Sequence, residues 1–236
     1  MARRACYARH VVTDVDVIRV ELQRVLALSP SRLDLVALAI ARLDDDPFDD
    51  DEALATLDEW GESVRRAAVG RSREATVEVL AAMLGGKLGL RGDTDQYDDP
   101  ENSFLPRVLE RRLGLPILLS IVYIEVGRRA GVPLFGLALP GHFVVAYRRP
   151  QRNAGQIVLD PFRSGRELSD ADVEEIGFRS SAPITPDMFG PATPYTIATR
   201  TLRNLLGSYQ RRKRWQKART VAQLMQAIDP DDDALN

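Results

Sequence analysis

One stretch of this 236-residue sequence, residues 114 to 162, most constrains what the chain can fold into. The segment from Gly114 to Arg129 is rich in Leu, Ile and Val, carries Pro116 in its first turn and ends on two arginines, which predicts a buried helix. Apolar runs of strand length follow at residues 134–139, 143–147 and 156–159. Because turn-forming residues separate these runs, we expect short antiparallel strands packed against the helix.

Helices are predicted on both sides of this stretch. Apolar residues recur at helical spacing over residues 14–28, 32–43, 52–69, 73–88, 196–210 and 216–228. We expect Ser31 to cap the second of these helices, and Asn102 and Ser103 to cap a short helix over residues 104–112. Residues 1–13 show no clear period and are interpreted as a loose arm.

The expected fold class is therefore α+β, mostly helical, with a small antiparallel sheet packed on a buried helix. We divide the chain into an N-terminal helical region over residues 1–92, a core over residues 93–190 and a C-terminal helix pair over residues 191–236.

Composition narrows the class of protein. A net charge of −2 argues against the whole molecule binding nucleic acid, and no apolar run is long enough to span a bilayer. The single cysteine, Cys6, cannot form an internal disulfide, and the first residues lack the apolar segment of a secretory signal, so we expect a cytoplasmic protein. The basic segment from Arg211 to Arg219 is interpreted as a solvated helix face, because no aromatic ladder accompanies it.

Two acidic segments invite a metal interpretation. Residues 44–52 contain seven acids, and Asp93, Asp95 and Asp98 lie close together in a polar loop. A calcium loop needs oxygens at alternate positions around a central glycine, and neither segment has that pattern. We therefore interpret both as capped or structural turns, and we expect no metal and no cofactor.

A histidine and an aspartate mark the most promising site for chemistry. His142, one of only two histidines, follows a Pro-Gly turn at the start of a predicted strand, and Asp160 ends the next strand. A carboxylate that orients an imidazole can create a general base.

Several separated motifs resemble the SirB-type transglutaminase-like family, whose members often carry tetratricopeptide-like C-terminal helices. The residues that carry the resemblance are Tyr97-Asp98-Asp99-Pro100-Glu101-Asn102-Ser103-Phe104-Leu105, Val108 to Ser120, Pro140-Gly141-His142-Phe143-Val144-Val145, Leu159-Asp160-Pro161-Phe162, Thr201 to Leu206 and Ile228 to Asp231. The resemblance implies a reduced papain/transglutaminase core.

The resemblance also implies roles within a catalytic triad. In active relatives a cysteine at the start of the core helix is the nucleophile, the histidine is its base and the aspartate orients the imidazole. Here the cysteine position falls at or beside Pro116, which has no nucleophilic atom, and Cys6 lies far upstream. Ser120 lies one helical turn deeper on the same face. Ser103 is a second hydroxyl that the fold could bring close.

Two hypotheses follow. In the first, the protein lacks the thiol nucleophile and is a binding or regulatory module that holds a peptide or protein segment in a cleft near His142, with Asn102, Pro116 and Tyr97 lining it and a possible second partner at the C-terminal helices. In the second, it is an amide or ester hydrolase or acyltransferase that uses His142 and Asp160 with a serine or a water molecule as nucleophile.

Overall fold

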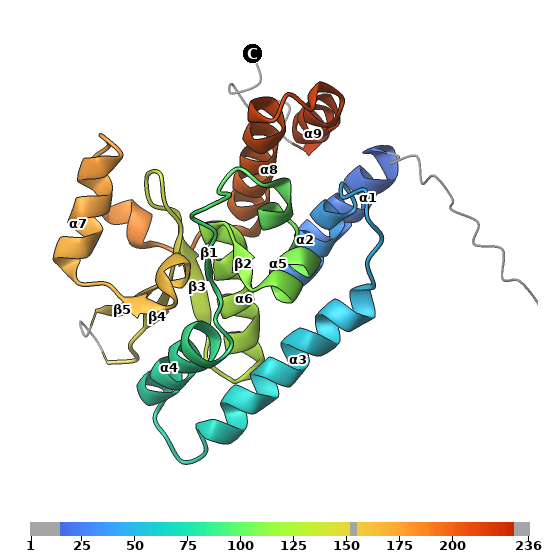
Figure 1. The fold of residues 1–236 in the computed structure, drawn as a ribbon. Coiled ribbons are helices and arrows are strands. Elements are labelled where there is room, and N and C mark those ends of the chain that lie inside the picture. The colour runs from blue at the N-terminus through green and yellow to red at the C-terminus, as the bar shows by residue number, and fades with distance from the viewer. Residues whose placement is uncertain (1–14, 152–154, 229–236) are drawn as a thin grey trace, which may run out of the picture.

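The computed structural model describes residues 15–151 and 155–228, and it confirms the mostly helical α+β class with a small antiparallel sheet (Figure 1). The expected arm over residues 1–13, including Cys6, lies outside the described residues. The α-helices are α1 (Val15–Leu26), α2 (Leu33–Ala41), α3 (Asp50–Ala67), α4 (Arg73–Ala81), α5 (Leu105–Arg111), α6 (Pro116–Arg129), α7 (Asp170–Arg179), α8 (Pro194–Arg211) and α9 (Trp215–Ile228).

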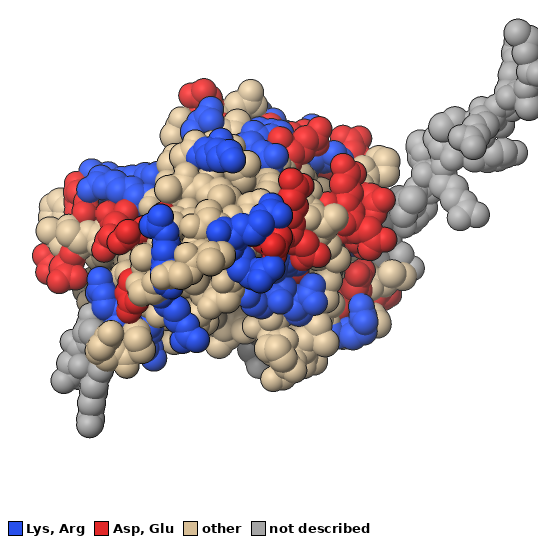
Figure 2. Space-filling model, turned by 90° about the horizontal axis from the view of Figure 1, so that it is seen from below, with Lys and Arg blue, Asp and Glu red and all other residues tan. Residues whose placement is uncertain are grey.

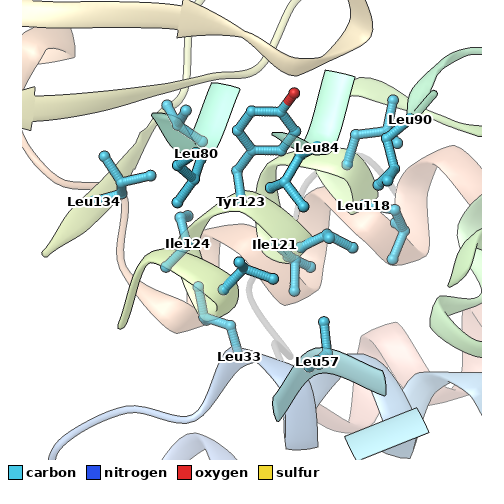
Figure 3. Packing of buried hydrophobic residues seen from close by; sticks show 14 of the residues in the cluster. Leu33, Leu57, Leu80, Leu84, Leu90, Leu118, Ile121, Tyr123, Ile124 and Leu134 are labelled. Atoms are coloured by element: carbon cyan, nitrogen blue, oxygen red, sulfur yellow. The ribbon is translucent and has the colours of Figure 1, made fainter. Parts of the chain in front are cut away.

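Helix α6 is the centre of the fold. It begins with Pro116 in its first turn and contacts α2, α3 and α4 as well as the sheet strands, so it is buried as predicted. Figure 3 shows its core contacts, in which the labelled residues are Leu33, Leu57, Leu80, Leu84, Leu90, Leu118, Ile121, Tyr123, Ile124 and Leu134. Each buried Leu or Ile side chain stabilises the fold by about 1.5–3 kcal/mol relative to an exposed one, so this helix fixes the surrounding elements.

The sheet lies on one side of α6 and has four antiparallel strands in the order β3–β4–β5–β6. Their bounds are β3 (Leu134–Leu137), β4 (Val144–Arg148), β5 (Gln156–Asp160) and β6 (Arg166–Glu167). The sequence predicted the first three strands. It missed β6, because two exposed charged residues carry no apolar alternation. The sequence also missed a separate parallel pair, β1 (Arg91–Gly92) with β2 (Leu113–Gly114), because strands of two residues are too short to show a pattern.

The two ends of the described chain share a second core. Helices α1 and α2 pack with α8 and α9, and Leu22, Ile40 and Leu205 lie fully buried among them. The C-terminal helix pair therefore rests on N-terminal helices and does not stand alone (Figure 1). The proposed divisions after residues 92 and 190 stay a prediction.

Side chains cap some of the helix starts. Asp49 caps α3, and Ser169 with Asp172 forms a capping box at α7. The prediction for Ser31 was wrong: α2 has Arg32 at its N-cap with no side-chain cap, and the buried Glu125 carboxylate accepts the Leu33 N–H at 2.9 Å.

The prediction that Asn102 and Ser103 cap the next helix was also wrong. Both belong to a separate 3₁₀ turn, Pro100–Ser103, which the Asp99 side chain caps. Phe104 is the N-cap of α5, and no side-chain cap is present there. The helix predicted over residues 73–88 changes at Ala82 into a short π-helix, Ala82–Lys87, in which Gly85 and Gly86 lie.

The acidic segments serve as partners of basic side chains. Asp44 binds Arg107 at 2.8 Å, and Asp93 accepts a hydrogen bond from Arg111 at 3.1 Å. Within residues 15–151 and 155–228, no cluster of three or more His, Cys, Asp or Glu side chains could hold a metal ion.

Two arginines of the basic segment before α9 also form ion pairs. Arg211 pairs with Asp98 at 2.6 Å, and Arg212 pairs with Asp99 at 3.2 Å. Basic and acidic side chains likewise intermix on the face seen from below (Figure 2). Among the helices of the described chain, none is both long and apolar enough to cross a membrane.

Candidate functional site

The structure brings His142 and Asp160 together. His142 lies in the connection between β3 and β4, directly after Gly141, whose φ of +64° places it in the left-handed region that glycine tolerates. Asp160 is the last residue of β5, which pairs with β4 in antiparallel register. As a result His142 Nε2 and Asp160 Oδ2 are 3.0 Å apart.

Asp160 is held firmly in this orientation. Its side chain is 1% exposed, and its Oδ1 accepts the backbone N–H groups of Phe162 at 3.0 Å and Arg163 at 3.3 Å. Those amides open a 3₁₀ turn, Pro161–Arg163, for which Asp160 is the N-cap. Oδ2 is thus left to face the imidazole, while the Arg163 Nε lies 3.7 Å from it.

This geometry selects the tautomer of His142. When Nε2–H donates to the carboxylate, the neutral ring has its lone pair on Nδ1. Nδ1 forms no hydrogen bond to any residue that the structure describes, and the side chain is 18% exposed. The imidazole is therefore arranged to accept a proton from a group that reaches it through solvent.

Three glycines leave room for the turn after Asp160. Two of them lie elsewhere in the chain, and the third follows the turn. A Cβ on Gly92 would overlap the Phe162 ring, and one on Gly85 would overlap the Ser164 carbonyl. Gly165 has a φ of +76°, and a Cβ there would lie 2.6 Å from the Tyr123 hydroxyl. Larger side chains at these positions would displace the turn that orients Asp160.

Aromatic rings extend the site on one side. The Phe162 ring meets the His142 ring edge-on with centroids 6.3 Å apart, and the Tyr97 ring with centroids 5.9 Å apart. Tyr97 is 45% exposed, so it forms part of the surface on which Phe162 rests. The Tyr123 hydroxyl beneath the turn is buried without a hydrogen-bond partner among the described residues, and burial, followed by the charge of Asp160, raises its pKa.

The proposed substitute nucleophiles form no hydrogen bond with the imidazole. Ser103 and Ser120 are both fully buried, and neither hydroxyl forms a hydrogen bond to His142 or to any other described residue. Pro116 is buried in the first turn of α6. Asn102 is fully buried, with its side-chain amide donating to the Gln96 carbonyl at 2.8 Å, so it joins the loop before it to the core rather than opening into solvent.

A hollow of about 260 Å³ opens beside His142. Its lining residues are Pro140, Gly141, His142, Arg163, Ile176, Arg179 and Ser180. A second hollow, of about 630 Å³, shares Arg179 with it and is flanked by Phe178, which is 86% exposed. No sequence motif pointed to Arg179, because α7 is remote from every motif, whereas Arg163 directly follows one.

Comparisons with known proteins agree with this geometry. A family model described as transglutaminase-like superfamily matches residues 51–203, a range that includes α6, His142 and Asp160. No solved structure matches the chain.

Curated relatives match over a large part of this chain. A UPF0162 protein of Xylella fastidiosa strain Temecula1 is 42% identical over 154 residues, which is 61% of this chain and 53% of that protein. A UPF0162 protein of Pseudomonas aeruginosa is 32% identical over 76% of this chain and 66% of its own length. Human F-box only protein 21 is 28% identical over 67% of this chain and 26% of its own length.

The share of each protein that the matches cover decides whether they show the family of this chain. The chain spans about half the length of the Xylella relatives that it matches. The family model, however, covers more than half of this chain and includes both residues of the His–Asp pair. The chain belongs to the transglutaminase-like superfamily.

Proposed function

We propose that this protein is a SirB-type transglutaminase-like module without a thiol nucleophile, which binds an extended peptide or protein segment across the hollow beside His142. One observation carries the proposal: the ring of His142 reaches solvent and is oriented by Asp160, yet no described hydroxyl or thiol is hydrogen-bonded to it. A base without a nucleophile can still hold a ligand through hydrogen bonds.

The shape of the surface favours an extended ligand. The 260 Å³ hollow has room for a side chain or two, and the larger hollow begins at the shared Arg179. A polypeptide that crosses both would meet polar groups at His142 and Arg163 and an apolar surface at Phe178. We propose the tetratricopeptide-like pair α8 and α9 as a second docking surface, in which Trp215 is 64% exposed.

A hydrolase is the second candidate function, and the oriented His–Asp pair favours it. A water molecule at the free Nδ1 of His142 would lose a proton to the imidazole while its oxygen attacks an acyl carbon. The imidazolium would then return that proton to the leaving group, and Asp160 would stabilise the charge.

Two assays separate these functions. Dodecapeptides selected by phage display should bind the wild type, and Arg163→Ala and His142→Ala should each weaken binding tenfold or more. Arg65→Ala, on an exposed arginine of α3, is the matched control and should change nothing. Selected peptides that bind all variants equally would refute the cleft as the binding site.

Hydrolysis of p-nitrophenyl acetate tests the second candidate. An enzyme of this kind should lose activity by about 10²–10⁴-fold on His142→Ala. Hydrolysis at the background rate, or at an equal rate in the variant, contradicts it.

A designed thiol tests the inferred nucleophile position. In a Cys6→Ser background, Pro116→Cys would place a thiol at the start of α6, where the helix end favours the thiolate, and we propose that this thiol lies within reach of His142. We expect iodoacetamide to alkylate this thiol faster than the thiol of Ser120→Cys, and His142→Ala to remove the difference. Equal rates with and without His142 would place the position elsewhere.

A further inference from the structure

A hollow of about 470 Å³ lies between the start of α3 and helix α5, and it shares no lining residue with the hollow beside His142. Its walls combine an apolar floor with charged groups of both signs. Phe48 and Leu109 contribute to the floor, Arg112 lies on one side, and Asp49 and Glu52 come from the first turn of α3 and its cap.

Arg112 is the unusual member of this set. It follows α5 with a φ of +63°, and its guanidinium lies over the Trp60 ring, 4.3 Å from the centroid. The guanidinium forms no hydrogen bond or ion pair with any residue of the described chain, and its Nη1 is fully buried without a partner. Burial lowers the pKa of Arg112, which Glu59 offsets only in part. The cation therefore has no carboxylate in direct contact among the described residues.

Three carboxylates line the hollow, and none forms an ion pair with Arg112; Glu110 lies 3.7 Å from Arg107 instead. Asp49 uses its side chain to accept the Asp51 N–H at 2.9 Å, as the cap of α3. Neither Asp49 nor Glu52 forms an ion pair with a described basic residue. The other arginine of the hollow, Arg107, is bound to Asp44 at 2.8 Å and is therefore already compensated.

The geometry points to this hollow as a binding site for a small apolar α-amino acid. Its carboxylate would pair with the Arg112 guanidinium, its ammonium would face Asp49 and Glu52, and its side chain would rest on Phe48 and Leu109. The hollow is large enough for a ligand of this size, and it combines apolar walls with a few polar groups that would fix the ligand's orientation. The site is independent of the cleft at His142.

L-Leucine is the probe for this site, with isovalerate and isoamylamine as analogues that lack the ammonium and the carboxylate. Titrations of the full chain, followed by amide chemical shifts and calorimetry, should give a leucine Kd of about 1 mM or tighter. Each analogue should bind at least tenfold more weakly, because one charged contact is lost.

Two variants address the two walls separately. Arg112→Met keeps a stem over Trp60 and should abolish leucine binding. Glu52→Gln, at an exposed position that leaves the fold intact, should weaken leucine tenfold while leaving isovalerate unchanged. Glu62→Gln, on α3 outside the hollow, is the control and should not alter binding.

The proposal is overturned by a leucine titration without saturable shifts at residues of the hollow. It is also overturned if isovalerate binds as tightly as leucine, or if leucine binds Glu52→Gln as tightly as the wild type. None of these outcomes bears on peptide binding at His142, because the two hollows share no residue.

Discussion

The substitution Gly92→Ala tests how the Asp160 turn is positioned. A Cβ at residue 92 would overlap three atoms of the Phe162 ring, so the ring or β1 must move by an amount on the order of 1 Å to restore carbon contacts. The Phe162 ring contacts the rings of both His142 and Tyr97, and the Phe162 backbone N–H donates a hydrogen bond to Asp160. A shift of Phe162 would therefore reach the His–Asp pair.

The magnitude follows from two opposing effects. Overpacking in a well-packed region costs about 1–3 kcal/mol. Replacing glycine by alanine restricts the unfolded chain and offsets about 0.4–1 kcal/mol of that cost. We expect a net loss of about 1–2 kcal/mol in the free energy of unfolding, and a Tm lower by about 2–8 °C for a domain of this size.

Urea denaturation of five proteins measures this effect: the wild type, Gly92→Ala, Gly86→Ala, Phe162→Ala and the Phe162→Ala/Gly92→Ala double variant. The matched control is Gly86→Ala in the π-helix, where a Cβ would meet nothing within 4 Å, so its stability should stay the same or rise slightly. In a Phe162→Ala background the overlap is gone, and Gly92→Ala should then cost nothing. The reasoning is refuted if Gly92→Ala lowers the unfolding free energy as much in the Phe162→Ala background as in the wild type. It is also refuted if Gly92→Ala and Gly86→Ala change the unfolding free energy equally, because the Phe162 contact would then not position this turn.

Three further predictions concern buried and paired polar groups. Asp34→Asn should lower the unfolding free energy by about 3–5 kcal/mol at pH 7, because the fully buried Asp34 binds Arg32 and Arg129 at 2.9 and 2.8 Å. Burial opposes ionisation of Asp34, yet these arginines hold its pKa below the ordinary 3.8. The stabilisation from ionised Asp34 is therefore present above pH 3.8 and is lost as the pH falls through the lower pKa of the folded state. The unfolding free energies of the two proteins, measured in urea, should converge in acid. Ser120→Ala should keep or slightly raise stability in thermal melts, because the buried hydroxyl has no partner among the described residues, and a loss of about 1 kcal/mol or more would reveal a missed hydrogen bond. Arg212→Ala should cost less than about 1 kcal/mol in low salt and less still in high salt, because its bond to Asp99 is partly exposed, and a larger cost in high salt would contradict an ionic origin.

The sequence was most informative where apolar spacing is long and regular. Helix α6 and strands β3, β4 and β5 were all predicted, because burial on one or both faces leaves a periodic trace. The pairing of His142 with Asp160 follows from antiparallel strands β4 and β5, which place the end of one beside the start of the other. Local pattern therefore anticipated both the core and the His–Asp pair.

Features that depend on distant partners could not be predicted in this way. The start of α2 relies on the Glu125 carboxylate 92 residues away, so a search for a local cap selected Ser31 wrongly. Arg179 reaches the hollow of His142 because the end of α7 packs near Gly141, a contact with no sequence signature. The contact of Arg112 with the Trp60 ring joins residues 52 positions apart, and no local pattern indicates it.

The orientation of the His–Asp pair does not depend on a nucleophile. Asp160 takes its direction from the amides of Phe162 and Arg163 and from the glycine contacts around the turn, all of which lie outside the first turn of α6. His142 takes its direction from Asp160 and from the connection after Gly141. The residue at position 116 can therefore change without disturbing the base. This independence is why Pro116→Cys is a direct test: the imidazole is oriented before any thiol is added, so the part of the thiol's reactivity that His142→Ala removes reports whether position 116 lies within reach of the base.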